Sequence, residues 1–450
     1  NLDPIKLSEL GECPYDQGGY FVINGKEKVF LSQESTVNNI LYINKVSGDN
    51  VILRGNIKTI SNEGLQSSRT NHVTLRSINL LGEKMPPHKE TIQLIKRGYE
   101  IKERKENVID VRILGINEVN GGNDLRIPVF ILFRALGFEK EKEILDLIIY
   151  DSDDEKLKQE LYKQLVPSIK DSQPFYTQKN ALKYLSLHVK NKEMINVIDT
   201  LNNNFLPNYS SNYKFKAIYL GYVCRQLLLT HLGIIKETDR DSYTMKRINL
   251  AGNLLLELYR ELWGKYLRNI SRKLDDEFKL FLEGDGDDVS IVINNINKDT
   301  IFNSKVMDDI VKSFGASFGT GISKKQGIVQ DLNRNVMLGT LSHVRRLSTP
   351  LPSGSKIIGP RKLHNSQWGI VCPIESPDGG NVGIINHLSI MAKVTTNISE
   401  EGIIEALKDM NILFLVDITS RDYDSTKIFL NGRIIGLYND GPFLYKYLKL

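Results

Sequence analysis

Residues 361–380, RKLHNSQWGIVCPIESPDGG, contain four side chains whose types could do chemistry: His364, Cys372, Glu375 and Asp378. A cysteine beside a histidine base would form a nucleophilic pair, and the carboxylates could hold a metal ion. However, Cys372 precedes a proline in the apolar run GIVCP, where cysteine usually behaves as a small buried hydrophobic residue. We therefore favour a structural role for Cys372 over a catalytic thiol.

A second acidic stretch, GDGDD at residues 284–288, places carboxylates at alternating positions, as Ca²⁺ or Mg²⁺ sites do. An EF-hand needs a further ligand at the twelfth loop position, and none completes the loop here, where Asn295 or Asn297 lies in that vicinity. The simpler interpretation is an exposed acidic turn that closes the preceding helix.

Positive charge is concentrated in residues 321–362. The net charge of this segment is larger than the +5 of the whole chain, so the remaining residues sum to a negative value. Asp331 is its only acid, and its bases are Lys324, Lys325, Arg334, Arg345, Arg346, Lys356, Arg361 and Lys362. A solvated surface normally mixes signs, whereas a focused basic patch suits a polyanion.

Two loop sequences interrupt this basic segment, SFGTGISKKQG (317–327) and TPLPSGSKIIGP (349–360). Glycine and serine let a backbone approach phosphates closely, and lysine or arginine neutralises them. On the residues alone we favour contact with nucleic acid over an ordinary surface.

The composition is that of a globular protein with two to four domains: 450 residues, 41% hydrophobic and 25% charged. No run of about 18 apolar residues appears, and the N-terminus has no signal-peptide pattern. The chain starts with Asn1 instead of Met, which suggests a piece of a longer chain. Three distant cysteines without a CxxC pair favour a reducing compartment and argue against a disulfide framework or a cysteine-rich zinc site.

The elements that must position these residues are both strands and helices. Asn-Gly pairs inside 18–34 and 427–437 predict β-hairpins. Residues 127–137 form a buried apolar run that ends in a helix cap, and 140–235 are helical with interruptions at Pro167, Pro174 and Pro207. Apolar residues at three- and four-residue steps predict one long helix over 253–283.

Four strings in the last third occur in order: LSHVRR (341–346), PRKLHNSQWG (360–369), VCPIESPDG (371–379) and VGIINHLS (382–389). They resemble the fork of the second-largest (beta-like) subunit of multisubunit DNA-directed RNA polymerases, in the branch of eukaryotes, archaea and large DNA viruses. ESPDG stands where the family usually has ETPEG. Upstream, ECPYDQGGYFVINGKEKVFLSQE resembles the protrusion hairpin, RIPVFILFRALGF the first lobe helices, and DRDSYTMKRINLAGNLL the return into the protrusion.

The resemblance implies an α+β multidomain fold that is clipped at its N-terminus. The expected parts are the protrusion (1–94), the lobe (95–246), the return of the protrusion (247–310), the fork (311–393) and the start of a first external domain (394–450).

It also implies a subunit of a nucleotidyltransferase that has no catalytic residue of its own. The catalytic Mg²⁺ would be held mainly by the largest subunit, and Zn²⁺ by a C-terminal part that does not appear here. This chain would form one side of the active-centre cleft and contact downstream DNA and the RNA–DNA hybrid. Since backbone contacts carry no base information, this binding should not depend on sequence.

The resemblance assigns roles to residues of the basic segment. Lys356 and Arg361 would lie where the downstream duplex opens, Lys324 and Lys325 at the upstream edge of the hybrid, and Arg345 and Arg346 along the cleft. Glu375, His364 and Asn365 would support them, with Glu375 orienting arginines through charge-assisted hydrogen bonds. We expect Trp368 to pack in the core.

The implied partners are the largest and smaller polymerase subunits, template DNA, the RNA–DNA hybrid, nucleoside triphosphates, and transcription factors on the lobe and protrusion, with no membrane. The implied location is the nucleus, or a viral factory or virion for a large DNA virus. Two alternatives remain open: a stand-alone, non-specific nucleic-acid-binding module derived from this fold, and a cysteine hydrolase that uses Cys372 and His364.

Overall fold

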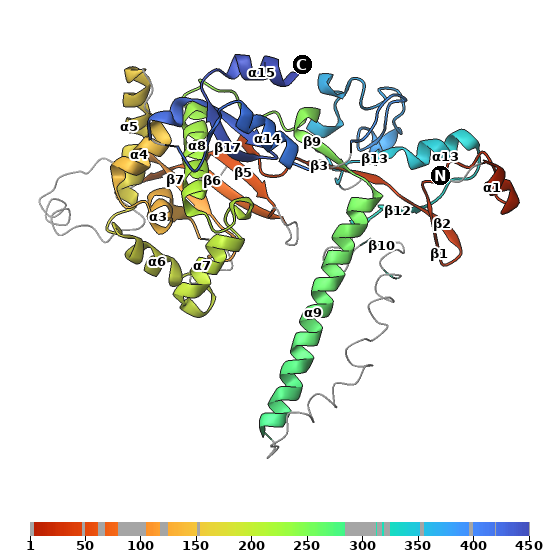
Figure 1. Ribbon diagram of the computed structural model, residues 1–450, viewed down its shortest axis with the longest axis horizontal. Helices are drawn as coiled ribbons and strands as arrows, with labels where there is room; N and C mark the ends of the chain where they lie inside the picture. The colour runs from red at the N-terminus through yellow and green to blue at the C-terminus, as the bar shows by residue number, and fades with distance from the viewer. Residues whose placement is uncertain are drawn as a thin grey trace, which may run out of the picture. The chain divides into compact units, whose positions relative to one another are not determined.

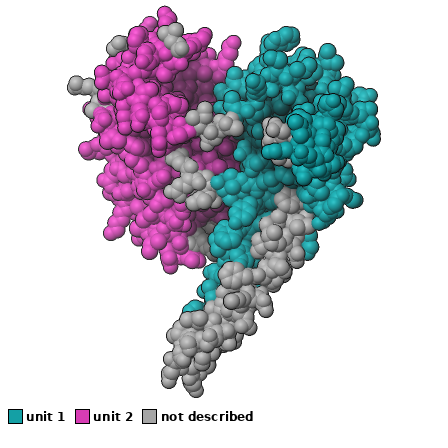
Figure 2. Space-filling view, turned by 45° about the vertical axis from the view of Figure 1, so that its right-hand side comes forward, with its two compact units in different colours: residues 1–36, 241–396 teal, residues 37–240, 397–450 magenta. Residues whose placement is uncertain are grey.

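A computed structural model of the chain describes residues 4–46, 50–61, 68–79, 105–117, 125–150, 154–283, 312, 317–318, 325–351, 355–395, 399–418 and 420–449. The chain divides into two compact units, coloured separately in Figure 2. Unit 1 comprises residues 1–36 and 241–396, and unit 2 comprises residues 37–240 and 397–450. Each unit thus joins two stretches that are distant in sequence. The five-part division expected above uses other bounds and stays a prediction. The mixture of helices and sheets confirms the α+β class.

Unit 2 is built on an antiparallel sheet with the strand order β4-β5-β6-β7-β8. Burial alternates strictly along β5 (Val51–Thr59), which is the pattern of a sheet with one face against a core. Helix α8 (Tyr213–His231) packs on this sheet (Figure 1) and is buried along most of its length.

The other elements of unit 2 are short helices and strands on either side of α8 in the sequence. They are β4 (Leu41–Lys45), β6 (Arg69–Asn79), β7 (Lys105–Arg112), β8 (Ile127–Pro128), α3 (Val129–Ala135), α4 (Glu141–Ile149), α5 (Glu155–Asp171), α6 (Gln178–Ser186), η1 (Lys190–Lys192), α7 (Met194–Asn203), η2 (Pro207–Tyr209), α14 (Glu401–Asp409), β15 (Leu413–Phe414), η8 (Ser420–Asp424), β16 (Thr426–Leu430), β17 (Arg433–Tyr438) and α15 (Gly441–Lys449).

The proline positions in unit 2 give two confirmations and one correction. Pro174 lies between α5 and α6, and Pro207 lies between α7 and α8, as predicted. Pro167, however, lies inside α5 and does not interrupt it. A proline in a helix interior costs about 3 kcal/mol. Here α5 packs against β7 and buries Leu161 and Leu165 completely, which offsets that cost.

Both predicted hairpins are present, one in each unit. The turns are Asn24-Gly25 between β1 (Phe21–Ile23) and β2 (Lys26–Phe30), and Asn431-Gly432 between β16 and β17. All four turn residues have φ between 49° and 80°. These angles fit a type I′ turn, which requires positive φ at both central positions and therefore favours Asn-Gly.

Unit 1 holds a four-stranded sheet of order β14-β13-β3-β9 that is assembled from three separate stretches of chain. β3 (Ser32–Thr36) pairs in parallel with β13 (Arg346–Ser348) and antiparallel with β9 (Lys246–Asn249). β14 (Ile385–His387) pairs antiparallel with β13. This sheet brings the N-terminal stretch against the basic segment.

The remaining elements of unit 1 include two smaller sheets, of order β1-β2-β12 and β10-β11. The helices, turns and strands of this remainder are α1 (Pro4–Glu9), β1 (Phe21–Ile23), β2 (Lys26–Phe30), η3 (Tyr243–Met245), α9 (Ala251–Glu283), β10 (Ser317–Phe318), β11 (Lys325–Gln326), β12 (Val329–Asp331), α13 (Met337–Val344), η5 (Gly359–Arg361), η6 (Asn365–Gln367) and η7 (Gly379–Asn381).

The predicted long helix is confirmed as α9, a single helix of 33 residues (Figure 1). Its first turns are anchored: Leu254, Leu258 and Leu262 are buried, whereas Tyr259 and Trp263 are exposed. The GDGDD stretch that follows lies outside the described residues.

Candidate nucleic-acid interface

The sheet of unit 1 places Arg346 directly opposite His387, because the two residues are paired across β13 and β14. The Arg346 Nε atom donates a hydrogen bond to His387 Nε2 at 3.2 Å. On the other side of the ring, His387 Nδ1 lies 3.0 Å from the Glu375 backbone oxygen. A carbonyl oxygen can only accept, so Nδ1 carries the proton and Nε2 is free to accept from Arg346.

Glu375 lies close to this pair without bonding the arginine directly. Its carboxylate accepts a hydrogen bond from the Ser342 hydroxyl, and its Oε1 is 3.6 Å from His387 Nε2. Burial lowers the pKa of the Arg346 guanidinium, and the Glu375 charge acts in the opposite direction. Glu375 therefore acts on Arg346 through its charge, while His387 makes the hydrogen bond that we had expected from the carboxylate.

A second histidine, His343, lies near Arg346 and His387 and is 4% exposed. Its Nδ1 accepts from the Asn333 amide at 3.2 Å, and its Nε2 contacts Gln330 Oε1 at 3.0 Å. Burial, followed by the nearby Arg346 and His387, lowers the pKa of His343. The hydrogen bonds of His343 to Asn333 and Gln330 support the end of α13.

Two further arginines use their terminal nitrogens to hold loops together. Arg345 Nη2 donates to Ser389 O at 2.6 Å. Arg361 Nη1 donates to Gly380 O and Val382 O at 2.9 and 2.8 Å, and its Nη2 donates to Ser355 O at 2.9 Å. Both guanidinium groups therefore hold the loops that surround the sheet.

The loop around Arg361 also depends on a glycine. Gly383 has a φ of 68°, and a Cβ at this position would lie 2.5 Å from the Arg361 backbone oxygen. Only glycine avoids both the left-handed strain and the contact, so Gly383 allows the two backbone segments to pack closely.

The remaining cations of the basic segment differ in their exposure. Arg334 is bound by the carboxylates of Glu27 and Asp16 at 2.8 and 3.1 Å. Lys356 and Lys362 are exposed, and within the described residues their side chains make no hydrogen bond or ion pair. Lys324 lies outside the described residues, as does the side chain of Lys325 on β11. Lys362 was counted in the basic segment but was not predicted as a contact.

His364 and Asn365 form the start of the turn η6. His364 Nδ1 lies 2.7 Å from the Ser366 hydroxyl, which in turn accepts from the Tyr243 amide at 2.8 Å. Asn365 is exposed. The Nδ1 atom of His364 is therefore directed at Ser366, and the cysteine-hydrolase alternative stays a hypothesis.

Our expectation that Trp368 packs in the core is wrong, because this side chain is 87% exposed. The turn η6 buries Gln367 instead and directs the next residue outward. Ile390 and Met391 are also strongly exposed, and the Ser389 hydroxyl donates to Gly369 O at 2.6 Å, which ties their loop to the loop of Trp368. Large exposed apolar side chains that gather in this way are typical of interaction surfaces.

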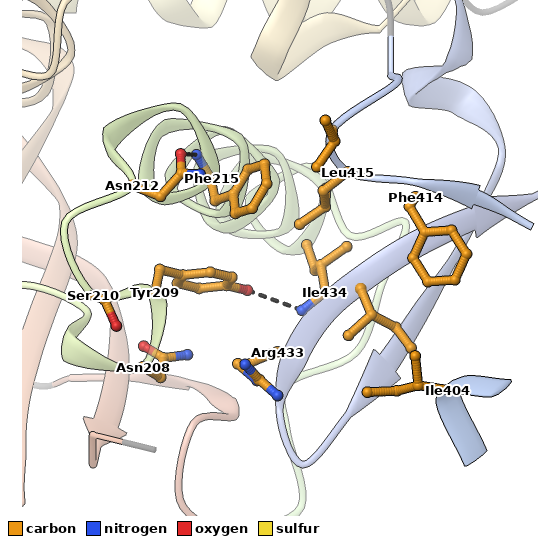
Figure 3. A pocket seen from close by; sticks show the side chains of 12 residues that line it. Asn208, Tyr209, Ser210, Asn212, Phe215, Ile404, Phe414, Leu415, Arg433 and Ile434 are labelled. Carbon is orange, nitrogen blue, oxygen red and sulfur yellow. Dashed lines mark hydrogen bonds between the residues drawn. The ribbon is translucent and has the colours of Figure 1, made fainter. Parts of the chain in front are cut away.

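Outside this region, unit 2 has an apolar pocket of about 330 Å³ beside the first turn of α8 (Figure 3). The Tyr209 hydroxyl accepts a hydrogen bond from the Ile434 amide at 2.9 Å and closes one side of the pocket. Phe215, Phe414 and Leu415 line it as well. The pocket offers mainly apolar surface and does not involve the basic segment.

Two further observations concern metals and membranes. Within the described ranges, no group of three or more His, Cys, Asp or Glu side chains is arranged to hold a metal ion. In the same part of the chain, none of the helices has the length and apolar character needed to cross a membrane.

Comparison with known proteins gives two family matches and a set of relatives that match nearly the whole of this chain. Residues 122–249 match the family described as "RNA polymerase Rpb2, domain 2", and residues 330–394 match "RNA polymerase Rpb2, domain 3". The chain is 31% identical to DNA-directed RNA polymerase II subunit RPB2 of Encephalitozoon cuniculi, and the match covers 99% of the chain and 36% of that protein.

Further relatives include plant and archaeal proteins. Identity is 32% to DNA-directed RNA polymerase II subunit 2 of Arabidopsis thaliana, over 98% of the chain and 35% of the relative. It is 26% to DNA-directed RNA polymerase subunit Rpo2 of Sulfolobus acidocaldarius, over 100% of the chain and 36% of the relative. The chain thus spans about a third of the length of the relatives it matches.

Proposed function

Because this chain belongs to the family of second-largest subunits of DNA-directed RNA polymerases, we propose that it forms one side of the active-centre cleft of such an enzyme. In this role it contacts downstream DNA and the RNA–DNA hybrid during template-directed RNA synthesis. The observation that carries the proposal is the match of 98 to 100% of the chain to second subunits of eukaryotes and an archaeon.

The cations of the basic segment differ in what they bind, and this difference supports the proposal. Arg345 and Arg361 hold the loops, whereas Lys356 and Lys362 extend into solvent. A lysine ammonium is a compact, mobile charge that neutralises a phosphate without demanding a fixed geometry. Such contacts suit an enzyme that must accept every template.

The chemistry assigned to this chain is charge neutralisation and positioning. Nucleotidyl transfer in this family is a metal-assisted phosphoryl transfer, in which the protein orients the reactants and stabilises negative charge. We assign the catalytic Mg²⁺ to the largest subunit. The side chains Lys324, Lys325, Arg345, Arg346, Lys356 and Arg361 would reduce the repulsion between the strands and the incoming nucleotide.

The proposed partners follow from the same assignment. We place the largest subunit and the smaller polymerase subunits around this chain, with transcription factors on its outer parts. The exposed Trp368, Ile390 and Met391 would be buried in that assembly. The relatives from eukaryotes favour a nuclear location, and a viral factory remains the expectation for a large DNA virus. Co-purification should recover a largest subunit in equal amount.

A charge-deletion experiment tests the contact with nucleic acid. We expect the double variant Lys356→Ala, Lys362→Ala of the 450-residue chain to bind a fluorescent RNA–DNA hybrid more weakly. Its salt dependence, the slope of log K against log salt, should fall in magnitude by about 2, since each phosphate contact contributes about 0.9. Fluorescence anisotropy at several salt concentrations measures both quantities.

The matched control removes two exposed lysines from unit 2, Lys163→Ala and Lys179→Ala, and should bind like the wild type. Two hybrids of unrelated sequence should give the same affinities. The proposal fails if the double variant and the wild type have the same salt slope, or if the loss depends on the base sequence.

A further inference from the structure

We propose that His387 is a positioning residue that directs the terminal nitrogens of Arg346 toward a nucleic-acid phosphate. The inference rests on the proposed function and concerns a residue that the sequence analysis did not select. It begins from a difference among the arginines of the basic segment.

Arg346 differs from Arg345 and Arg361 in which of its nitrogens are bound. Arg345 and Arg361 donate from their terminal nitrogens to backbone carbonyls. Arg346 donates from Nε to His387, and its Nη1 and Nη2 make no hydrogen bond to the described part of the chain. These two nitrogens form the edge of a guanidinium group that binds phosphate oxygens in a bidentate manner.

His387 can hold this orientation because both of its ring nitrogens are fixed. The ring is 6% exposed, and the cross-strand pairing of β13 with β14 sets its position relative to Arg346. The contact of Nδ1 with the Glu375 backbone oxygen determines the tautomer, and the Nε2 lone pair then meets the Arg346 Nε–H. The histidine thus couples the strand of Arg346 to the loop of Glu375.

The same ring also separates two opposite charges. The Glu375 carboxylate lies 3.6 Å from His387 Nε2 and is held by the Ser342 hydroxyl. Without an acceptor at Nε2, the Arg346 guanidinium would turn to this carboxylate and form an ion pair. Arg346 would then be neutralised within the protein, and a phosphate would lose a bidentate partner.

Two amide substitutions separate the functions of the two ring nitrogens. In His387→Gln, the side-chain oxygen reaches the position of Nε2 and can accept from Arg346. In His387→Asn, the shorter amide occupies the position of Nδ1, so it can donate to Glu375 O but cannot reach Arg346. Both variants keep a polar group in the buried site. His188→Asn is the matched control, since His188 contacts a backbone oxygen of unit 2 through Nδ1 at 3.2 Å.

The experiment measures a structural and a functional quantity on the 450-residue chain. The first is the ¹⁵N–¹H signal of Arg346 Nε, assigned through Arg346→Lys. It should stay protected from solvent exchange in His387→Gln and lose protection in His387→Asn. The second is the affinity for a fluorescent RNA–DNA hybrid at low salt. We expect a loss of about fivefold in His387→Asn, as for one charge-assisted hydrogen bond, and near-wild-type binding in His387→Gln.

The outcomes separate this inference from the proposed function. If the wild type binds the hybrid and Arg346→Ala weakens binding, but His387→Asn binds like the wild type, the positioning role of His387 is overturned. Unchanged protection of Arg346 Nε in His387→Asn overturns it as well, whatever the affinity. If the wild-type chain and all variants fail to bind the hybrid, the proposed function itself fails. Recovery of binding in His387→Asn by the second change Glu375→Gln supports the charge-separating role.

Discussion

The two units differ in what holds their interiors together. In unit 2 more than forty buried apolar residues form one continuous cluster, to which both of its stretches of chain contribute. In the described part of unit 1 the two clusters are small, with six and three buried residues. Unit 1 instead contains the Arg334 network, the buried Lys246–Glu34 ion pair at 2.6 Å, and the loops held by arginines. Unit 2 is held by apolar burial, and unit 1 depends much more on directed polar bonds.

This difference fits the work that we propose for unit 1. A surface that binds a polyanion must keep many cations close together. Burial of apolar side chains does not offset the repulsion between these cations. Arginine suits this task because its planar guanidinium group can bind several carbonyl oxygens at fixed angles. The loops are consequently fixed by the same residue type that supplies much of the positive charge.

Unit 2 also contains buried charged groups, such as the Arg76–Asp110 ion pair, the Arg134 guanidinium and the Lys216 side chain. The Lys216 ammonium is fully buried and donates to the backbone oxygens of Leu201 and Phe205 at 2.6 and 2.7 Å, at the end of α7. Burial lowers the pKa of Lys216 to about 7. Even here the charge serves to cap a helix, since the C-terminal carbonyls of a helix lack partners within it.

The largest expected effect is a cavity in unit 2. Phe133 is 0% exposed, so Phe133→Ala should lower the free energy of unfolding by about 3–5 kcal/mol. Phe443→Ala, at a position that is 53% exposed, should cost about 0.5 kcal/mol or less. Chemical denaturation monitored by circular dichroism measures both. If both variants lost a similar amount of free energy of unfolding, burial of apolar side chains would not be what stabilises unit 2.

An intermediate effect is expected where unit 1 packs backbone against backbone. Gly383→Ala combines left-handed strain with a contact to the Arg361 backbone and should cost about 2 kcal/mol. It should also weaken hybrid binding, because the loop of Arg361 must move. Gly252→Ala in α9 meets no atom within 4 Å and should leave stability unchanged or raise it by up to about 1 kcal/mol. Amide hydrogen exchange around Arg361 measures the local effect, and unchanged protection there would contradict the prediction.

The smallest effect concerns the ion pairs of unit 1. Arg334→Gln removes the partner of Asp16 and Glu27 and should cost about 1 kcal/mol, a value kept low because solvent reaches and screens these partly exposed groups. The loss should shrink in high salt, unlike that of Phe133→Ala. Thermal denaturation at low and high salt tests this contrast, and equal losses at both would argue against a charge-held unit 1.

The same variant should change the acid sensitivity. The Gly18 amide, then Tyr20 and Arg334, lower the pKa of Asp16, and the hydrogen bond from Arg334 lowers the pKa of Glu27. Carboxyls with lowered pKa values stabilise the fold above their ordinary values of 3.8 and 4.5, and this contribution disappears as the pH falls through the lowered values. The wild type should therefore lose stability more steeply below about pH 4.5 than Arg334→Gln.

Local features of the fold were predictable from the sequence, and distant pairings were not. The Asn-Gly turns and the apolar steps of α9 depend on neighbouring residues, so their patterns identify them directly. The continuation of α5 through Pro167 depends on packing against β7, which no local pattern encodes. The exposure of Trp368 likewise depends on the direction of a turn that buries Gln367 instead.

The candidate site was predictable in composition but not in arrangement. Charge counting located the basic segment, yet it could not distinguish arginines that hold loops from lysines that face solvent. His387 lies more than forty residues from its partner Arg346, and its role follows from the pairing of two three-residue strands. Such short strands have no reliable sequence pattern.

The parallel pairing of β3 with β13 also has a consequence for the synthesis of the protein. More than three hundred residues separate Ser32 from its partner Leu347. A ribosome that adds about 5–20 residues per second needs roughly 15–60 s to cover that distance. Throughout this time β3 lacks a neighbour on one side. Its sequence, SQEST, contains no apolar residue, so the unpaired strand edge has little tendency to aggregate with another nascent chain.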